Sequence, residues 1–289
     1  MRTEYLTKAK TALLAMGIKG GIEELRTKDG ISLFRVYFGG RQAVLKYFHK
    51  AEFSREITNY QLLKEAGLNT LPVIAKTENA ILLEDLQSSP KLRLATKDDL
   101  NLVEIAAALA GWYKELHGVD AGRLIQEGFS FYSELDFITT ANLHKLIRML
   151  GNDTPKALRW VEAVFDELQA LLSQARKTLT YNDFYYTNLA VARDGKAAFM
   201  FDYNLLGLGF PAMDLRNVTS SMNEEAGKAF LRAYGPVDPL EVKLNEIISP
   251  ITGLLIGMER KPLPPWFYEE LEEINTIDFQ SKLQSLLGI

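Results

Sequence analysis

The sequence of 289 residues contains no cysteine. This absence excludes disulfides, a thiolate nucleophile and a cysteine-ligated zinc site, and it suits a reducing compartment such as the cytoplasm. Histidine is almost as scarce, because only His49, His117 and His144 occur and they lie far apart in the sequence. A Ser-His-Asp triad or a multi-histidine metal site would need these distant residues to meet. Hydrolase and zinc-enzyme chemistry are therefore disfavoured.

An excess of positive charge is also missing. The chain has 33 Lys and Arg against 37 Asp and Glu, a formal net charge of -4, which lacks the electrostatic signature of a nucleic-acid-binding protein. No eighteen uncharged apolar residues follow one another, and residues 1–5 do not lead into such a run, so we expect neither a membrane span nor an export signal. We expect a soluble, cytoplasmic protein that is a monomer or a weak dimer.

The chain is long enough, with 47% hydrophobic residues, to bury one large core or two modest ones. Its first part has the pattern of a small antiparallel sheet, in which Asp29-Gly30 and Gly39-Gly40 separate the first three apolar stretches as hairpin turns do. A helix is predicted over residues 53–66, because Phe53, Ile57 and Tyr60 share a helical face. The five predicted strands are 21–27, 31–38, 42–48, 71–75 and 80–86.

The pattern changes from strands to helices at the polar segment 87–90, Gln-Ser-Ser-Pro. Apolar residues then recur at steps of three and four over 102–116 and over 161–172, which predicts two helices with buried faces. Further along, Asp194-Gly195 marks a hairpin between two short apolar stretches. We therefore predict an α+β fold with two lobes, a small sheet-containing lobe over residues 1–87 and a larger, mainly helical lobe over residues 88–289.

Lys46 is the first residue that this pattern does not explain. It alternates with Val44 and Phe48 on one face of a predicted strand, where an unpaired ammonium would be costly to bury. Glu56, on the helix that follows, is a candidate partner, and Glu52 is a competing one. Taken alone, Lys46 could equally be an edge-strand lysine that reaches water, and Glu56 a solvated helix residue.

Three oxygen-bearing side chains lie in loops beside short apolar strands further along the chain. Asp183 and Asn188 are five residues apart, and Asp202 closes the predicted hairpin that follows them. Each could merely cap a turn, which is a common role of Asp and Asn in loops. Together with a lysine and its carboxylate partner they supply the parts that phosphoryl transfer needs: a phosphate-binding cation, two metal ligands and a base.

This layout resembles the aminoglycoside phosphotransferase and choline kinase-like family, which is related to the protein kinases. The family's catalytic loop has an Asn five residues after its Asp, a spacing that here falls on Asp183 and Asn188. Its metal-binding Asp matches Asp202, and its Pro-Ala-x-Asp-Leu matches residues 211–215. The Leu-His pair at positions 116–117 ends a helix as in the family. The resemblance covers roughly residues 20–220, through several motifs in the same order.

The resemblance implies a bilobal, protein-kinase-like fold and a small-molecule kinase that uses ATP and Mg²⁺. Asp183 would be the catalytic base, and Asn188 and Asp202 would hold the metal. Lys46 and Glu56 would form the phosphate-binding pair, and the segment from Glu84 to Leu86 would meet the adenine. The acceptor would be a hydroxyl group of a small molecule; acidic segments such as residues 269–273 could attract a cationic acceptor, although acidic helix faces are usually just solvated.

Two features depart from the family pattern. Tyr181 stands where the family has His, and because a tyrosine hydroxyl can also donate a hydrogen bond, we expect altered packing with chemistry retained. Residues 184–186, Phe-Tyr-Tyr, replace a smaller, glycine-containing sequence and indicate either tighter packing or an aromatic wall toward the acceptor. As in small-molecule kinases of this group, the first hairpin has no Gly-x-Gly-x-x-Gly, so backbone N–H groups at its short tip would contact phosphates.

Two other functions remain open. A nucleotide-binding protein without turnover, like a pseudokinase, is suggested by Tyr181 and the bulky loop beside it. A kinase for protein side chains is disfavoured, because the segment between Asp202 and Asp214 contains no Ala-Pro-Glu and is too short for an activation segment.

Overall fold

The computed structural model describes residues 2–288. The chain forms two compact units, and each is assembled from separate stretches of sequence. Among the described residues, no helix is both long and apolar enough to cross a membrane. The predicted division of roles between residues 1–87 and 88–289 stays a prediction. The first unit comprises Met1–Val119, Tyr181–Leu206 and Asn217–Gly235, and the second comprises Asp120–Thr180, Gly207–Arg216 and Pro236–Ile289.

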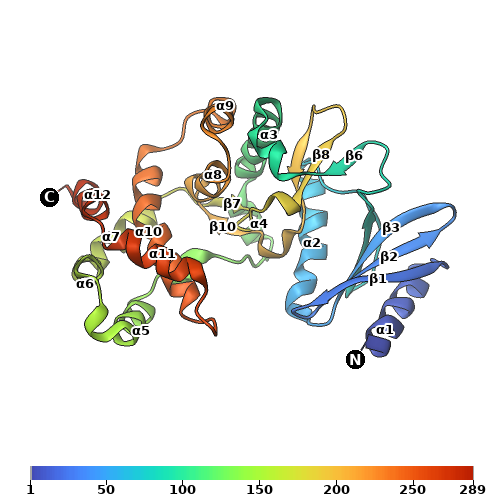
Figure 1. Cartoon of the computed structure of the whole chain (residues 1–289), viewed down its shortest axis with the longest axis horizontal. Coiled ribbons are helices and arrows are strands. Elements are labelled where there is room, and N and C mark those ends of the chain that lie inside the picture. Colours follow the sequence, from blue (N-terminus) through green and yellow to red (C-terminus); the bar gives the residue numbers. More distant parts are fainter. Residues whose placement is uncertain (1, 289) are drawn as a thin grey trace. The chain divides into compact units, whose positions relative to one another are not determined.

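The first unit is built on a five-stranded antiparallel sheet in the order β1-β2-β3-β5-β4 (Figure 1). The first hairpin turns at Asp29 and Gly30, both with positive φ. Two such residues match the twist of the strands that they join. The predicted order of strands and helix along the chain is confirmed. The strands are β1 Gly21–Lys28, β2 Ile31–Phe38, β3 Arg41–Phe48, β4 Val73–Lys76 and β5 Ala80–Glu84.

The two faces of this sheet have different neighbours. Phe34, Val36, Ala43 and Leu45 are fully buried in one core cluster with residues of helix α1, Arg2–Ala15, and Figure 1 shows α1 beside β1–β3. Helix α1 was not predicted from the sequence. Its buried stripe is narrow, made by Ala9, Ala12 and Leu13, while the neighbouring Leu14 is 62% exposed, so its amphipathic pattern is weak.

Helix α2, Ala51–Glu65, packs on the sheet and contacts β3 and β5. It begins two residues earlier than predicted, and the chain leaves it through Gly67 with a φ of 86°, a left-handed conformation that glycine adopts without steric cost. Its buried residues include two polar ones, Glu56 and Asn59. The helix therefore brings hydrogen-bonding groups, as well as apolar ones, to the inside of the unit.

A three-stranded sheet in the order β6-β8-β9 belongs to the same unit. The β8–β9 hairpin was predicted, but β6 was not, because it has three residues and pairs with a strand almost a hundred residues away. Helix α3, predicted at 102–116, packs against α9 (Figure 1). The elements are β6 Leu92–Leu94, η1 Lys97–Asn101, α3 Val103–Gly118, η4 Tyr186–Asn188, β8 Leu189–Ala192, β9 Ala198–Met200, η5 Tyr203–Leu205 and α9 Glu224–Tyr234.

The second unit is mainly helical, with a single pair of short antiparallel strands, β7 and β10, among its described residues. Its early elements are α4 Ala121–Gln126, η2 Glu134–Phe137, α5 Thr140–Leu150, η3 Gly151–Asp153, α6 Lys156–Ala163, α7 Phe165–Gln174 and β7 Thr178–Thr180. Its later elements are β10 Gly207–Gly209, α8 Pro211–Thr219, which runs on into the first unit, α10 Pro239–Gly257, α11 Pro265–Ile274 and α12 Ile277–Leu287.

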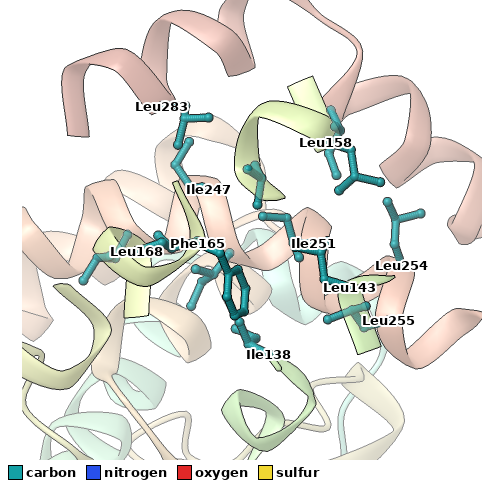
Figure 2. Packing of buried hydrophobic residues seen from close by; sticks show 14 of the residues in the cluster. Ile138, Leu143, Leu158, Phe165, Leu168, Ile247, Ile251, Leu254, Leu255 and Leu283 are labelled. Carbon is teal, nitrogen blue, oxygen red and sulfur yellow. The ribbon is translucent and has the colours of Figure 1, made fainter. Parts of the chain in front are cut away.

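The core of the second unit is a cluster of buried apolar side chains that includes Ile247 and Ile251 of α10 and Phe165 and Leu168 of α7 (Figure 2). The prediction of one helix over 161–172 was wrong. Val164 leaves the helical conformation, with φ -111° and ψ 22°, and separates α6 from α7. Nothing in the local sequence marks this break, because the buried residues on both sides join the same cluster.

Candidate active site

A cavity of about 250 Å³ opens in the first unit, on the face of the five-stranded sheet opposite to α1. The alternation of side chains along β2 and β3 places Leu33, Arg35, Val44 and Lys46 on this face. Its wall combines aliphatic side chains with a few charged ones, as small-molecule sites generally do. Lining residues are Leu25, Leu33, Arg35, Val44, Lys46, Glu56, Tyr60, Leu71, Leu83, Glu84, Asp85, Leu86, Gln87, Leu94, Phe201 and Asp202.

Lys46 is 6% exposed and lies between two carboxylates. Its Nζ is 2.6 Å from Oε2 of Glu56 and donates a hydrogen bond of 2.7 Å to Oδ1 of Asp202. Of the two partners considered for Lys46, the structure brings Glu56 to it, whereas Glu52 lies on the surface beside Lys50.

Burial dominates the electrostatics of this group. It raises the pKa of Glu56 to about 8, because the lowering by Lys46 is weaker than the cost of a buried charge, and Asp202 adds to the rise. Burial would lower the pKa of Lys46, but the charges of Glu56 and Asp202 outweigh it and the pKa of Lys46 is raised. Lys46 therefore stays a cation at the wall of the cavity, where its charge favours the binding of an anion.

Asp183 and Asn188 face one another across the loop between β7 and β8. Asn188 donates from Nδ2 to Oδ2 of Asp183 at 3.2 Å and to its carbonyl oxygen at 3.3 Å. The amide oxygen of Asn188 is thereby directed away from Asp183. Burial raises the pKa of Asp183 and so does the charge of Asp202, while Lys46 and Asn188 lower it. These electrostatic effects are those expected where Asp183, Asp202 and Lys46 are near neighbours.

Tyr181 is fully buried, and its hydroxyl donates a hydrogen bond to the carbonyl oxygen of Phe201, the residue before Asp202. Its ring also contacts Trp112 and Tyr203 edge to face. Tyrosine at this position thus ties the loop of Asp183 to the segment of Asp202, as the expected hydrogen-bond donor. Of the bulky residues that follow, Tyr185 is 64% exposed and Tyr186 38% exposed, so these two rings do not tighten the packing.

Asp202 adopts a left-handed conformation with φ 65° and ψ 72°, which Asp tolerates better than most residues do. Helix α2 holds the next two residues in place. Nδ2 of Asn59 donates to the carbonyl oxygen of Tyr203 and Nε of Arg55 to that of Asn204, each at 2.8 Å. The helix that carries Glu56 therefore also positions the segment of Asp202. Sequence reasoning missed Arg55 and Asn59, since a polar residue on a helix gives no sign of a distant backbone partner.

At the other end of the cavity, the wall includes Glu84 and Leu86, for which base binding stays a prediction. Between them, Asp85 is 3% exposed and accepts a hydrogen bond from Nε of Arg35 at 2.7 Å. Arg35 also donates from Nη2 to Oε1 of Gln87 at 2.7 Å. Neither Arg35 nor Gln87 was predicted from the sequence to be a site residue. Alternation along the strand shows only that Arg35 shares a face with Leu33, and the pairing of Leu33 with Lys46 identifies that face as the one toward the cavity.

The side-chain oxygens near Lys46 are suitable ligands for a magnesium ion that is bound together with a nucleotide. Among the described residues, no three or more His, Asp or Glu side chains form a group that could hold a metal by themselves. Asp202 offers a carboxylate that is 36% exposed, and Asn188 offers an amide oxygen. Mg²⁺ usually takes one or two carboxylates together with substrate phosphates and water, and such a site needs no larger set of protein ligands.

The sequence matches the phosphotransferase enzyme family over residues 28–244. No curated protein matches it. Solved structures of small-molecule kinases are similar over nearly the whole chain, at identities that show the fold alone. The predicted protein-kinase-like fold is confirmed by this similarity.

Three of these structures are representative. A choline/ethanolamine kinase family protein from Mesorhizobium loti has a TM-score of 0.65 and 18% identity, over 99% of both chains. The GDP complex of an aminoglycoside 2'-phosphotransferase-IIIa has a TM-score of 0.66 and 16% identity, over 98% of this chain and 99% of that one. A ternary complex of APH(2")-IIa with streptomycin and ATP has a TM-score of 0.58 and 18% identity, over 99% and 95%.

Proposed function

The chain belongs to the phosphotransferase enzyme family, and on that premise we propose that it transfers the γ-phosphate of ATP to a hydroxyl group of a small molecule. One observation carries the proposal. Lys46, buried on the wall of a cavity, contacts both the carboxylate that would orient it, Glu56, and the carboxylate that would bind the metal, Asp202. Packing alone gives no reason to bury a cation between two carboxylates there, whereas phosphoryl transfer requires these groups together.

A nucleotide would occupy the cavity with its base toward Glu84 and Leu86 and its phosphates toward Lys46. The aliphatic side chains that line the cavity suit a flat purine. Two of the similar structures were solved with GDP and with ATP, which supports a purine nucleotide as the phosphate donor. In the complex, the phosphates would replace Asp202 as a partner of Lys46 and leave this carboxylate available for the metal.

Asn188 and Asp202 would hold Mg²⁺. When bound, the ion supplies positive charge that stabilises the charge developing on the phosphate oxygens. The residues of the chain contribute by holding the charged groups in place. Glu56 fixes Lys46, and Asn59 and Arg55 fix the backbone after Asp202. Preorganised charges of this kind need no reorganisation during the reaction.

Asp183 would orient the acceptor hydroxyl and take its proton as the oxygen attacks the γ-phosphorus. Its hydrogen bond from Asn188 holds the carboxylate in one orientation. Burial and the charge of Asp202 raise its pKa, which makes it a better proton acceptor than a solvated Asp. The bond from the γ-phosphorus to the bridging oxygen breaks, and ADP leaves.

A small molecule fits the acceptor role better than a protein does. After Asp202, the chain forms η5 at residues 203–205 and β10 at residues 207–209, and α8 begins at Pro211. The chain thus has no free segment here that could act as the activation segment of a protein kinase. A cytoplasmic location and a monomeric or weakly dimeric state stay predictions.

A screen with γ-labelled ATP tests the proposal. Aminoglycosides, macrolides, choline, ethanolamine and sugars are incubated with the protein, Mg²⁺ and ATP or GTP, and labelled products are separated. We expect label on at least one alcohol and none with Asp183→Ala, which controls for contaminating kinases. Binding of Mg²⁺-ATP in a thermal-shift titration, with label on no acceptor and none released as phosphate, would instead favour the alternative, a nucleotide-binding protein without turnover.

A further inference from the structure

Arg35 lies on the cavity face of the sheet at a position where an aliphatic residue would complete the apolar wall. Its cross-strand neighbour on β3 is Val44, and Val44 in turn pairs with Leu83 of β5. All three side chains line the cavity. The Arg35 side chain is 16% exposed, so its charge is largely removed from water. Such burial is costly unless the guanidinium has a specific partner.

The partners of Arg35 fix the orientation of its guanidinium group. Nε donates to Asp85 and Nη2 donates to Gln87, each at 2.7 Å. Asp85 is itself held, because its Oδ1 accepts the backbone N–H of Gln87. Asp85 belongs to the segment from Glu84 to Leu86 that is predicted to meet the base, and Gln87 directly follows that segment. Because these hydrogen bonds use N–H groups of the guanidinium, its orientation is fixed, and the carboxylate of Asp85 balances its charge.

The register of the strands places Arg35 at the base end of the cavity. Lys46, at the phosphate end, lies opposite Leu33, whereas Arg35 lies opposite Val44, two residues away along β3. Two residues of a strand span about 7 Å. Arg35 is thus displaced from Lys46 toward Glu84 and Leu86, and its paired charge makes it a poor second phosphate ligand.

We propose that the guanidinium of Arg35 forms part of the wall against which the nucleotide base packs, and that it stacks on the face of the purine. A planar guanidinium stacks on aromatic rings, unlike the compact ammonium of lysine, and such contacts strengthen when they are removed from water. The inference rests on the proposed function and adds to it the residue that recognises the base. Asp85 and Gln87 then act as positioning residues that hold Arg35.

Adenosine and inorganic tripolyphosphate separate the two ends of the cavity, because one has no phosphate and the other no base. Binding of each is measured by calorimetry for the wild type, Arg35→Met and Arg35→Lys. Arg93→Met is the matched control, since it also removes an Arg–Asp ion pair, with Asp99, but Arg93 does not line the cavity. Thermal melting of each variant checks that it is folded.

We expect Arg35→Met and Arg35→Lys to weaken adenosine binding about five- to thirtyfold, as the loss of a desolvated cation–π contact predicts. Tripolyphosphate binding should stay within about twofold of the wild type, and the control should change neither. Unchanged adenosine binding in Arg35→Met, or full retention in Arg35→Lys, would overturn the stacking. Equal weakening of both ligands would overturn it too, by revealing a structural role. Failure of the wild type to bind even ATP would remove the proposed function as well.

Discussion

Replacing Glu56 by Gln should change how the stability of the first unit depends on pH. Glu56 is fully buried and its pKa is raised from 4.5 to about 8. Between these values the folded protein holds a proton that the unfolded chain has released, so the free energy of unfolding falls as the pH rises. Each unit of pKa corresponds to about 1.4 kcal/mol, and the wild type should lose at most about 5 kcal/mol across this range. In Glu56→Gln the side chain at position 56 cannot titrate, so the variant does not lose this part of its free energy of unfolding.

Urea unfolding between about pH 5 and pH 8.5 measures the effect. Trp112 is the only tryptophan in the sequence of the first unit, so a Trp160→Phe, Trp266→Phe background makes the fluorescence report on that unit. Glu52→Gln is the matched control on the same helix, because the Glu52 side chain is 63% exposed. We expect the stability of Glu56→Gln relative to the control to grow with pH. Parallel curves for the two variants would refute the assigned burial and coupling of Glu56.

Two further predictions concern the residues that position Asp202. Tyr181→Phe leaves the carbonyl of Phe201 without its hydroxyl donor and should lower the free energy of unfolding by about 1–3 kcal/mol. In this variant kcat should fall by a larger factor than KM for ATP rises. Tyr181→His keeps a hydrogen-bond donor and should recover part of kcat. Asn59→Leu removes the hydrogen bond to Tyr203, so the affinity for Mg²⁺-ATP measured by calorimetry should fall, while Gln61→Leu on the exposed side of the same helix should leave it unchanged. Equal affinities of Asn59→Leu and Gln61→Leu for Mg²⁺-ATP would show that α2 does not position the segment of Asp202.

Local patterns predicted the five-stranded sheet because its turns and strands are encoded by neighbouring residues. Asp29-Gly30 and Gly39-Gly40 carry the positive φ that hairpins need, and the alternation along β3 put Lys46 on an inner face. The short strands β6, β7 and β10 were missed because three residues show no period and their partners lie far along the chain. The same limit hid α1, whose narrow apolar stripe is meaningful only beside the sheet that it covers.

The spacing of residues in the sequence could not show which contacts hold the site residues in place. Glu52 and Glu56 are one helical turn apart and share a face in projection, yet only the packing of α2 decides which of them reaches Lys46. Tyr181 was recognised as a departure from the family, but its bond to the carbonyl of Phe201 joins two segments twenty residues apart. Arg35 escaped notice because an Arg in a strand reads as a surface residue until its neighbours are known.

The most direct test of the phosphotransferase account is the isosteric variant Asp183→Asn. Phosphoryl transfer to an alcohol found in the screen, or to water where none is found, is measured beside the dissociation constant of Mg²⁺-ATP, with Asp194→Asn in the exposed β8–β9 turn as control. The account predicts that transfer falls by about 10²- to 10⁴-fold, the usual contribution of a general base, while the ATP affinity and the control stay at wild-type values. A variant that transfers phosphate at the wild-type rate, or that loses ATP binding in step with activity, would contradict it.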